Sequence, residues 1–435
     1  MSGERREKVD GPNSPGKATN ASTTTGPQTG SANLTSIIIL CYNQVDYTTA
    51  CVESVLRHTP EPVELVFVDN GSTDGTRSYL DSLLSRTGDA TCHPPASITD
   101  IKIVRNDRNL GFAGGVNQGI REAAGDFILL LNNDVIVTPG WLGGLHTCAL
   151  RSTRIGLVGP MSNYVVGPQQ VLDPHYDLRK LDEYAMAFAR KHAGRLMKVS
   201  RVIGFCMLVR REVIDRIGGF DVTFGTGNFE DDDFCLRAII AGFDVVIAGD
   251  VFVHHFGSIS FKGARMDYAS IMQENAWKFA KKWRIELSAG GYNPLPILAR
   301  RFDPVSHYFP LVSEWSSKAL LAESVRLFEQ GRIEASYVAV TKALELEPNN
   351  PDAWHNMALI AMTQRDFRLA LQAWEKIPQT DMDSERFNLM GMCHFQVGDV
   401  DKAVECFRKA IELDADCPGA QENLDIALSS CKSMS

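Results

Sequence analysis

Between residues 36 and 248 the chain alternates short β-branched runs, which end in polar clusters, with longer amphipathic stretches. The apolar runs, which we predict to be strands, cover residues 37–40, 63–68, 101–104, 127–131, 202–209 and 245–248. This alternation is typical of an α/β domain in which helices cover a largely parallel sheet. Ligands of open α/β sheets bind at the carboxyl ends of the strands, so the polar clusters are expected to meet in one crevice.

Beyond residue 315 the strand pattern is absent and a helical pattern repeats. Four positions recur 33 residues later with similar side chains: Trp354 as Phe387, Ala358 as Gly391, Ala370 as Ala403, and Trp374 as Phe407. An upstream copy carries Gly331, Ala343 and Pro348, and Pro418 precedes a capping helix. The pattern resembles the tetratricopeptide repeat (TPR), whose helix pairs stack into an all-α solenoid. An unrelated helical bundle would not explain the matching offsets.

The length of 435 residues allows two or three folded units at about 150 residues each. Residues 1–34 are rich in Gly, Pro, Ser and Thr and lack apolar periodicity, so we predict a disordered tail there. We then expect an α/β domain over residues 35–300, a linker over 301–315, and about three repeats with a capping helix over 316–433.

Charge and hydropathy limit the partners of this chain. The net charge is −9, which gives no reason to expect a nucleic-acid partner. No apolar stretch approaches the roughly 18 residues of a membrane span, and no secretory signal is evident. The ten cysteines form no C-x-x-C pair, which fits reduced thiols. We therefore expect a cytoplasmic protein, with a peripheral position at the inner face of the membrane as the alternative.

Polar residues follow each of the first two predicted strands. Tyr42 and Asn43 come after the first; an aromatic ring can stack on a base and an amide can bond to its edge, although Tyr42 could equally be a packing residue. Asp69, Asn70 and Ser72 come after the second, where the plain alternative is an Asp/Asn turn. Their position directly after a buried strand favours a ligand-binding role.

A glycine-rich segment leads into the next predicted helix. It contains Asn109, Gly111, Phe112 and Asn117, and its small residues would let backbone amides approach an anionic group at the helix N-terminus. The segment does not match the G-x-G-x-x-G fingerprint, so a nicotinamide or flavin enzyme is disfavoured.

The fourth predicted strand ends in Asn132, Asn133 and Asp134. A carboxylate at a strand end suits Mg²⁺ or Mn²⁺, and with one acid present a substrate pyrophosphate would have to complete the shell. His254 and His255 end another apolar run, and since adjacent strand residues face opposite sides, at most one is expected to reach the crevice as a second ligand.

Four acids, Glu230 to Asp233, stand together at the start of a predicted helix. Capping explains one or two of them. Four adjacent carboxylates repel one another, so we predict that one acts as a base. Arg237 lies four residues after Asp233 and is expected to pair with it on one helix face.

Together these motifs resemble the inverting family 2 glycosyltransferases of the GT-A fold, over residues 36–283. The resemblance rests on Tyr42-Asn43, on Val68 to Gly75, on Asn109 to Phe112, and on Glu230 to Asp233 with Arg237. It implies a Rossmann-like mixed sheet that binds a nucleotide-diphospho-sugar. The departure is Asn132-Asn133-Asp134, where the family commonly has Asp-x-Asp.

The resemblance also implies roles for individual residues. Asp231 would be the catalytic base, with Glu230 and Asp233 as further catalytic candidates. Asp134 would hold the metal, and Gly257 and Ser260 match the family's His-x-Gly-Gly-x-Ser pattern in a way that favours His255 as its partner. The expected donor-binding residues are Tyr42, Asn43, Asp69, Asn70, Ser72, Asn109, Gly111, Phe112, Asn117 and Asn133.

The predicted activity is metal-assisted transfer of a sugar, with inversion, from a UDP- or dTDP-sugar to an acceptor hydroxyl. The acceptor would be a glycan, a lipid-linked saccharide or a protein, in cell-surface polysaccharide or protein glycan synthesis. The TPR region is expected to bind a protein partner or another copy of the chain. The alternatives are a non-catalytic TPR scaffold with a degenerate nucleotide-sugar site, and a nucleotidyltransferase.

Overall fold

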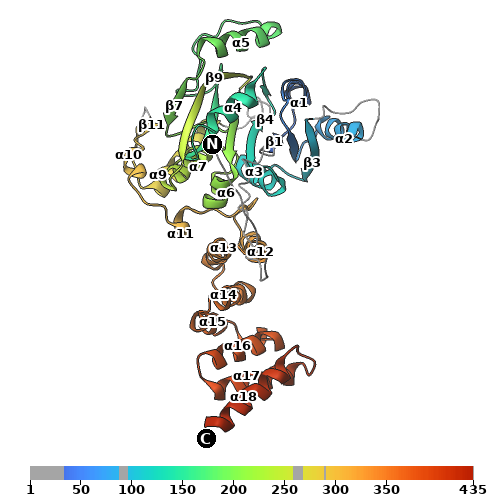
Figure 1. Cartoon of the computed structure of the whole chain (residues 1–435), viewed down its shortest axis with the longest axis vertical. Coiled ribbons are helices and arrows are strands. Elements are labelled where there is room, and N and C mark those ends of the chain that lie inside the picture. Colours follow the sequence, from blue (N-terminus) through green and yellow to red (C-terminus); the bar gives the residue numbers. More distant parts are fainter. Residues whose placement is uncertain (1–33, 88–96, 258–267, 289–290, 435) are drawn as a thin grey trace, which may run out of the picture. The chain divides into compact units, whose positions relative to one another are not determined.

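The computed structural model describes residues 34–87, 97–257, 268–288 and 291–434, so nearly all of the predicted tail lies outside the described residues. The description below concerns the unit Asn33–Ser435. Within it an α/β region is followed by an array of helices (Figure 1). In the described residues no helix combines the length and the apolar character that crossing a membrane requires.

The main sheet contains nine strands in the order β3-β2-β1-β4-β8-β6-β9-β5, with β7 paired to β9. These strands are β1 (Thr35–Cys41), β2 (Val63–Asn70), β3 (Ile98–Asn106), β4 (Phe127–Asn132), β5 (Val135–Ile136), β6 (Ile155–Ser162), β7 (Leu196–Val199), β8 (Cys206–Arg210) and β9 (Asp244–His255). The first four form a parallel set. β8 runs antiparallel to β4 and to β6, so the sheet is mixed rather than largely parallel.

The sequence pattern did not predict β6. Its sequence, IGLVGPMS, is interrupted by two glycines and a proline, which break the β-branched run that marks a strand. The strand is nevertheless fully buried. A side chain at Gly159 would meet Gln169 at 2.5 Å, so this glycine is needed because a neighbouring segment packs closely against the strand.

Helices cover both faces of the sheet. They are α1 (Val45–His58), α2 (Thr76–Thr87), α3 (Gly111–Glu122), α4 (Trp141–Ala149), α5 (Leu181–Lys191), α6 (Arg211–Ile217) and α7 (Glu230–Ile240), with short 3-10 turns η1 (Leu178–Lys180) and η2 (Val222–Phe224). Alternate residues of β1 separate the two cores: Ile37 and Ile39 pack with α1, α2 and α4, whereas Ile38 packs with α3, α6 and α7. Burial on both faces explains the continuous apolar runs of these strands.

Short elements connect the α/β domain to the helical array. They are α9 (Tyr268–Trp283), β10 (Leu287–Ser288), β11 (Gly291–Tyr292), α10 (Leu295–Leu298) and α11 (Pro304–His307). The segment that follows, within the predicted linker, is buried rather than exposed: Phe309 is 7% and Val312 1% exposed.

The helical array consists of pairs of contacting helices that follow the predicted repeat. Its helices are α12 (Ser317–Glu329), α13 (Ile333–Leu346), α14 (Pro351–Thr363), α15 (Phe367–Trp374), α16 (Ser384–Gln396), α17 (Val400–Leu413) and α18 (Ala420–Met434), with the 3-10 turn η3 (Gln379–Asp381). Asn350 and Asp383, which cap α14 and α16, are also 33 residues apart. A side chain at Gly391 would meet the buried Phe407 ring at 2.6 Å, which explains why this position is small.

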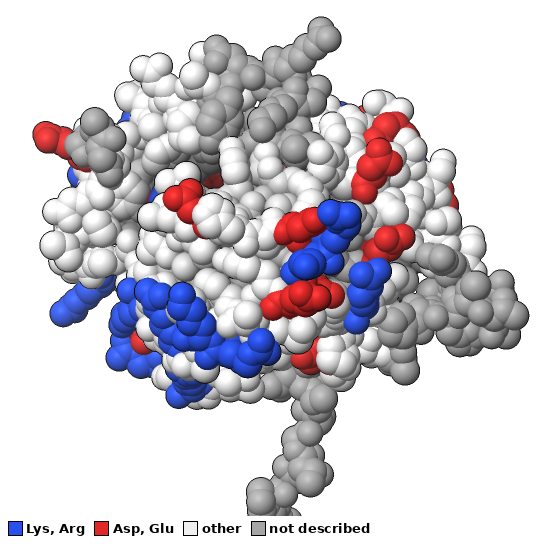
Figure 2. All heavy atoms as spheres, turned by 90° about the horizontal axis from the view of Figure 1, so that it is seen from above, with Lys and Arg blue, Asp and Glu red and all other residues white. Residues whose placement is uncertain are grey.

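Basic side chains gather on the face of the α/β domain that carries α5 (Figure 2). Six exposed basic residues lie on α5, on β7 and in the connections beside them: Arg151, Arg154, Arg190, Lys191, Arg195 and Lys198. These segments are adjacent, since Arg151 donates to the carbonyl of Gly194 (2.9 Å) and Asp244 pairs with both Arg154 and Lys198. The net charge of −9 is therefore unevenly distributed.

Candidate active site

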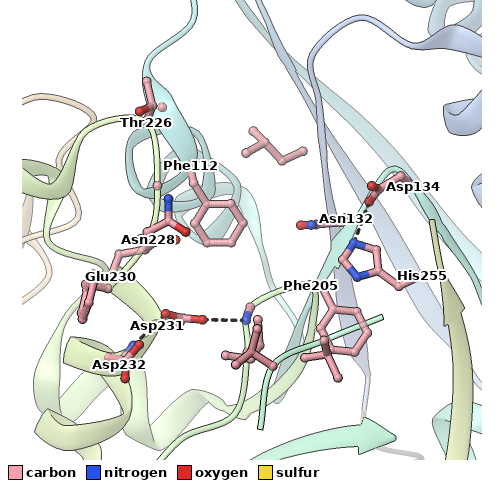
Figure 3. Close-up of a pocket in the computed structure, with 18 of the residues that line it drawn as sticks. Phe112, Asn132, Asp134, Phe205, Thr226, Asn228, Glu230, Asp231, Asp232 and His255 are labelled. Atoms are coloured by element: carbon pink, nitrogen blue, oxygen red, sulfur yellow. Dashed lines mark hydrogen bonds and ion pairs between the residues drawn. The ribbon is translucent and has the colours of Figure 1, made fainter. Parts of the chain in front are cut away.

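A cavity of about 360 Å³ lies at the carboxyl ends of β1, β2 and β4. Its walls come from these strand ends, the start of α3, the β4–β5 turn, the segment before β8, the start of α7 and the end of β9 (Figure 3). Ten of the predicted site residues line it: Tyr42, Asn70, Asn109, Gly111, Phe112, Asn133, Asp134, Glu230, Asp231 and His255. Polar segments that are distant in sequence thus converge on one cavity, as the sheet topology predicts.

Asp134 and His255 meet because β5 pairs with the end of β9. The antiparallel register places His255 opposite Val135, the residue after Asp134. The backbone N–H of Phe256 donates to the carbonyl of Asp134 (3.0 Å), which fixes the β4–β5 turn against β9. As a result Asp134 Oδ1 and His255 Nε2 lie 3.2 Å apart at the cavity wall (Figure 3).

The two neighbouring histidines face opposite sides of β9. His255 stacks on Phe205 at a centroid distance of 4.9 Å, and its Nδ1 lies 2.8 Å from the carbonyl oxygen of Tyr164. His254 instead lies 2.6 Å from the hydroxyl of Tyr176, and burial, with the neighbouring His255, lowers its pKa to about 4. Because adjacent strand residues alternate in direction, His255 and not His254 lines the cavity, as the motif spacing favoured.

The pair formed by Asp134 and His255 fits a divalent cation. His255 Nε2 is buried and has no hydrogen-bond partner among the described residues, and its 3.2 Å contact with Asp134 lacks hydrogen-bond geometry. Two adjacent ligands of an octahedral cation, each about 2.1 Å from it, lie about 3 Å apart. Within the described ranges no group of three or more His, Cys, Asp or Glu side chains is arranged for a metal. A cation here would thus need oxygen atoms from a bound substrate.

The acidic residues enter the cavity through an irregular turn before α7. Asn228 and Phe229 both have positive φ values, 78° and 72°, which non-glycine residues rarely adopt and which cluster at functional sites. The turn directs Asp231 toward the cavity, where its Oδ2 accepts the N–H of Gly204 (3.3 Å) and its Oδ1 accepts the N–H of Asp232 (2.9 Å). The carboxylate of Asp231 is thus held in one orientation.

Burial and crowding raise the pKa of two of these acids, Glu230 and Asp232. Burial, followed by the charge of Asp231, raises the pKa of Glu230 well above its usual range. The same two causes raise the pKa of Asp232 to about 7, although Arg201 (3.0 Å) and the Tyr292 hydroxyl (2.8 Å) donate to it. Like charges at this spacing oppose simultaneous ionisation, so the cavity wall retains a proton near neutral pH.

Three predicted donor-binding residues lie behind the cavity wall rather than on it. Asp69 is fully buried and accepts from Arg77 Nε (2.8 Å) and from the N–H of Ser72 (2.9 Å). The hydroxyl of Ser72 accepts the N–H of Asn43 (2.9 Å), and Asn43 Oδ1 accepts the N–H of Thr73 (2.7 Å). These bonds fix the loops that present Tyr42 and Asn70 to the cavity.

Two further predicted residues are placed away from the cavity, because their polar atoms are used in the core. The amide of Asn117 donates to the carbonyls of Phe220 (2.9 Å) and Val312 (2.8 Å). Asp233 is fully buried and pairs with Arg237 (2.8 Å), as its spacing predicted. Neither side chain lines the cavity, so we propose structural roles for both.

Several residues of the cavity were not predicted. Arg201, Gly204 and Phe205 come from the segment before β8, and Tyr164 comes from the segment after β6. No motif marks these positions, because irregular segments lack periodicity and reach the cavity only through tertiary folding. Asp232 stands within the acidic motif, but its contact with Arg201 depends on a partner 31 residues away.

Both parts of the chain match known protein families. The model for Glycosyl transferase family 2 matches residues 36–218. Two tetratricopeptide-repeat models match residues 339–372 and 384–417. The predicted resemblance and fold class, an α/β domain followed by TPR helices, are therefore confirmed.

Among curated proteins, the chain is 27% identical over 237 residues to the uncharacterized protein y4gI of Sinorhizobium fredii, covering 52% of this chain and 25% of that protein. It is 26% identical over 219 residues to an N-acetylglucosaminyl-diphospho-decaprenol L-rhamnosyltransferase of Mycobacterium tuberculosis, covering 42% of this chain and 64% of that protein. The chain thus spans less than two thirds of either relative.

A solved structure with a similar arrangement is the mannosyltransferase PcManGT from Pyrobaculum calidifontis in complex with GDP-Man and Mn²⁺. It has a TM-score of 0.41 and 17% sequence identity, and the match covers 85% of this chain and 86% of that chain.

Proposed function

We propose that this chain, in which a glycosyl transferase family 2 domain over residues 36–218 is followed by tetratricopeptide repeats, transfers a sugar from a nucleotide-diphospho-sugar to an acceptor hydroxyl. The observation that carries the proposal is the placement of two different groups in one cavity. Asp134 and His255 form a cation-binding pair on one side, and the acids of α7 lie on the other (Figure 3).

Asp231 is the proposed base. It removes the proton of the acceptor hydroxyl, whose oxygen attacks the anomeric carbon of the donor. The bond from that carbon to the diphosphate oxygen breaks, and the nucleoside diphosphate leaves with the electron pair. A single displacement inverts the anomeric centre. A divalent cation held by Asp134 and His255 would supply positive charge beside the diphosphate.

The start of α3 and the aromatic residues form the proposed donor site. Gly111 begins α3 at the cavity, so the partial positive charge of this helix N-terminus faces the space for a phosphate. Tyr42 and Phe112 supply rings for a base or a sugar. The acceptor class stays a glycan, a lipid-linked saccharide or a protein, and a protein partner or a second copy is proposed for the TPR helices.

Release of nucleoside diphosphate from a panel of UDP-, dTDP- and GDP-sugars, with Mg²⁺ or Mn²⁺, tests the proposal. Asp231→Asn should lower kcat about 10²- to 10⁴-fold, because the general base is lost, while donor affinity is retained. Asp366→Asn, at the exposed N-cap of α15, is the matched control and should keep the wild-type rate. Wild-type turnover by Asp231→Asn would reject the assignment, and absence of release with every donor would favour a scaffold.

A further inference from the structure

Residues 308–314, here called the connecting segment, are packed into the α/β domain through their backbone. The N–H of Phe309 donates to the carbonyl of Ile217 (3.0 Å), and its carbonyl accepts the N–H of Gly219 (2.7 Å). A side chain at Gly218 would lie 1.8 Å from the Phe309 carbonyl oxygen, so glycine is required for this approach. The segment therefore lies on the domain like an added strand rather than as a free linker.

The ring of Phe309 is surrounded by three cations. Lys282 Nζ lies 3.7 Å, Lys342 Nζ 4.7 Å and Arg237 Cζ 4.9 Å from the ring centroid. The attraction between a cation and a ring face is stronger when both are shielded from water. The three cations come from α9, α13 and α7, so one ring joins the first repeat to the helix that carries the acids.

Counter-charges connect this cluster to the cavity. Asp233 accepts from Trp283 (3.0 Å) and pairs with Arg237 (2.8 Å) and Lys282 (2.6 Å). Asp233 directly follows Glu230, Asp231 and Asp232, which line the cavity. Asp233 thus joins the Phe309 cluster to the first turn of α7.

The connecting segment also touches α3, the other helix whose start lines the cavity. Asn117 donates to the carbonyl of Val312 (2.8 Å), and a side chain at Gly114 would lie 2.5 Å from the carbonyl oxygen of Ser313. The segment thus contacts α3 and α7, two of the elements that form the site, without lining the cavity itself.

The first repeat holds the outer side of the connecting segment. The carboxylate of Glu323, only 1% exposed, accepts the N–H of Leu311 (3.3 Å). Val312 packs in one cluster with Leu320 and Ala343 of α12 and α13. Lys342 also lies over the ring of Trp315 (5.5 Å), the residue that directly follows the segment.

We infer that the first repeat is a structural part of the active site: through Lys342 and Phe309 it clamps the connecting segment and so positions the acid-bearing start of α7. Phe309 and Lys342 are positioning residues, and neither lines the cavity. The inference rests on the proposed sugar transfer for its kinetic consequence, whereas its structural consequence for α7 is independent of any activity.

Lys342→Met tests the inference in the full-length protein. We expect kcat for diphosphate release to fall about tenfold, because small misplacements of catalytic groups are costly, with the donor KM changed less than about twofold. Lys342→Arg keeps the cation and should restore kcat. Lys409→Met is the matched control, since Lys409 lies over the Phe387 ring (5.6 Å) at the corresponding place of a later repeat, and it should keep the wild-type kcat.

Hydrogen–deuterium exchange of residues 230–240 gives a reading that needs no turnover. Lys342→Met and Phe309→Leu should each speed exchange in α7 about tenfold, and Lys409→Met should leave it unchanged. Wild-type exchange in both test variants, or a wild-type kcat in Lys342→Met, would overturn the inference. If the wild-type protein releases no nucleoside diphosphate, the proposed function fails while the exchange measurement still decides the positioning role.

Discussion

Asp134 and His255 illustrate how two residues that are 121 positions apart in the numbering form one pair. Neither has a second acid or histidine beside it in the cavity, and among the described residues no larger ligand group is present. Their contact depends on the two-residue strand β5, which pairs with the end of β9. Cation binding at this pair is therefore expected to be weak until a diphosphate supplies further oxygen ligands.

Removal of either residue of the pair should strongly weaken metal-dependent donor binding. Asp134→Ala and His255→Ala are each expected to lower the donor affinity in the presence of Mn²⁺ about 100-fold or more, as measured by titration calorimetry. Even the loss of a residue that only supports a metal ligand lowers metal affinity about 10- to 100-fold. His254→Gln, which alters the histidine that faces Tyr176, should leave that affinity unchanged. An unchanged titration for Asp134→Ala would remove it from the site.

Asp232 should make stability fall as the pH rises. Burial and Asp231 raise its pKa to about 7, whereas an unfolded Asp titrates at about 3.9. Between these values the folded protein binds more protons than the unfolded chain, so the free energy of unfolding decreases with rising pH. Asp232→Asn removes this titration. Its free energy of unfolding in urea should therefore rise by about 2 kcal/mol relative to that of the wild type as the pH increases from about 5 to about 8.

Asp221 provides a control of opposite sign. Burial opposes its ionisation, but Lys282 at 2.7 Å holds the pKa of Asp221 below its usual range. Its contribution to stability is therefore present above the pKa of the unfolded chain and is lost only in acid. Asp221→Asn should lose stability throughout the same interval, and a gain of stability there would contradict the assigned charges.

At the scale of elements, the start of α3 depends on a backbone approach that only glycine permits. Gly111 has a φ of 77°, and a side chain there would lie 2.1 Å from the carbonyl oxygen of Gly225, in the turn that leads to α7. Two walls of the cavity are thus fixed against each other at one glycine.

Gly111→Ala and Gly140→Ala separate backbone strain from this contact. Gly140 has a similar φ of 74°, but a side chain there would meet nothing within 4 Å. Gly140→Ala should cost about 1–2 kcal/mol in urea unfolding, the penalty of the left-handed conformation. Gly111→Ala should cost about 1–3 kcal/mol more, because the neighbouring backbone must move. Equal losses would show that the contact with Gly225 is unimportant.

At the scale of the whole molecule, the last helices of the array and the first repeat differ in their relation to the α/β domain. Arg332, the N-cap of α13, donates to the carbonyl of Asp215 (2.9 Å), and Lys342 of α13 lies over the Phe309 ring, so α13 contacts both the domain and the connecting segment. The later helices pack around Trp374 and Phe387, in a core that α13 shares through Val340 and Leu344. We therefore propose that the boundary of the α/β unit lies after the first repeat.

Two truncations test this boundary. A chain that ends at Glu347 keeps the first repeat and should retain the thermal midpoint of the α/β domain. A chain that ends at Trp315 exposes Phe309 and Val312, and its midpoint should be lower by about 5–10 °C. Calorimetry of both chains against the full-length protein provides the measurement. Equal midpoints for the two truncations would place the boundary at the start of the repeats instead.

Local features of this protein could be predicted from its sequence. Strands that are buried on both faces appear as apolar runs, and a helix pair that recurs every 33 residues appears as a period, so the α/β domain, the repeats and the acidic and Asp134 motifs could be predicted. The sequence did not predict β6. The glycines and proline of this strand fit close packing against a neighbouring segment, and they have a low propensity for strand conformation.

Which polar residues face the cavity depends on contacts between segments that are distant in the sequence. Asn117 and Asp233 stand in the right motifs, yet their hydrogen bonds are made to Val312 and Trp283, which the motifs do not contain. Arg201 belongs to no motif and still faces the acids. A buried polar side chain points toward its hydrogen-bond partner. Because that partner is usually distant in sequence, the order of residues alone does not reveal it.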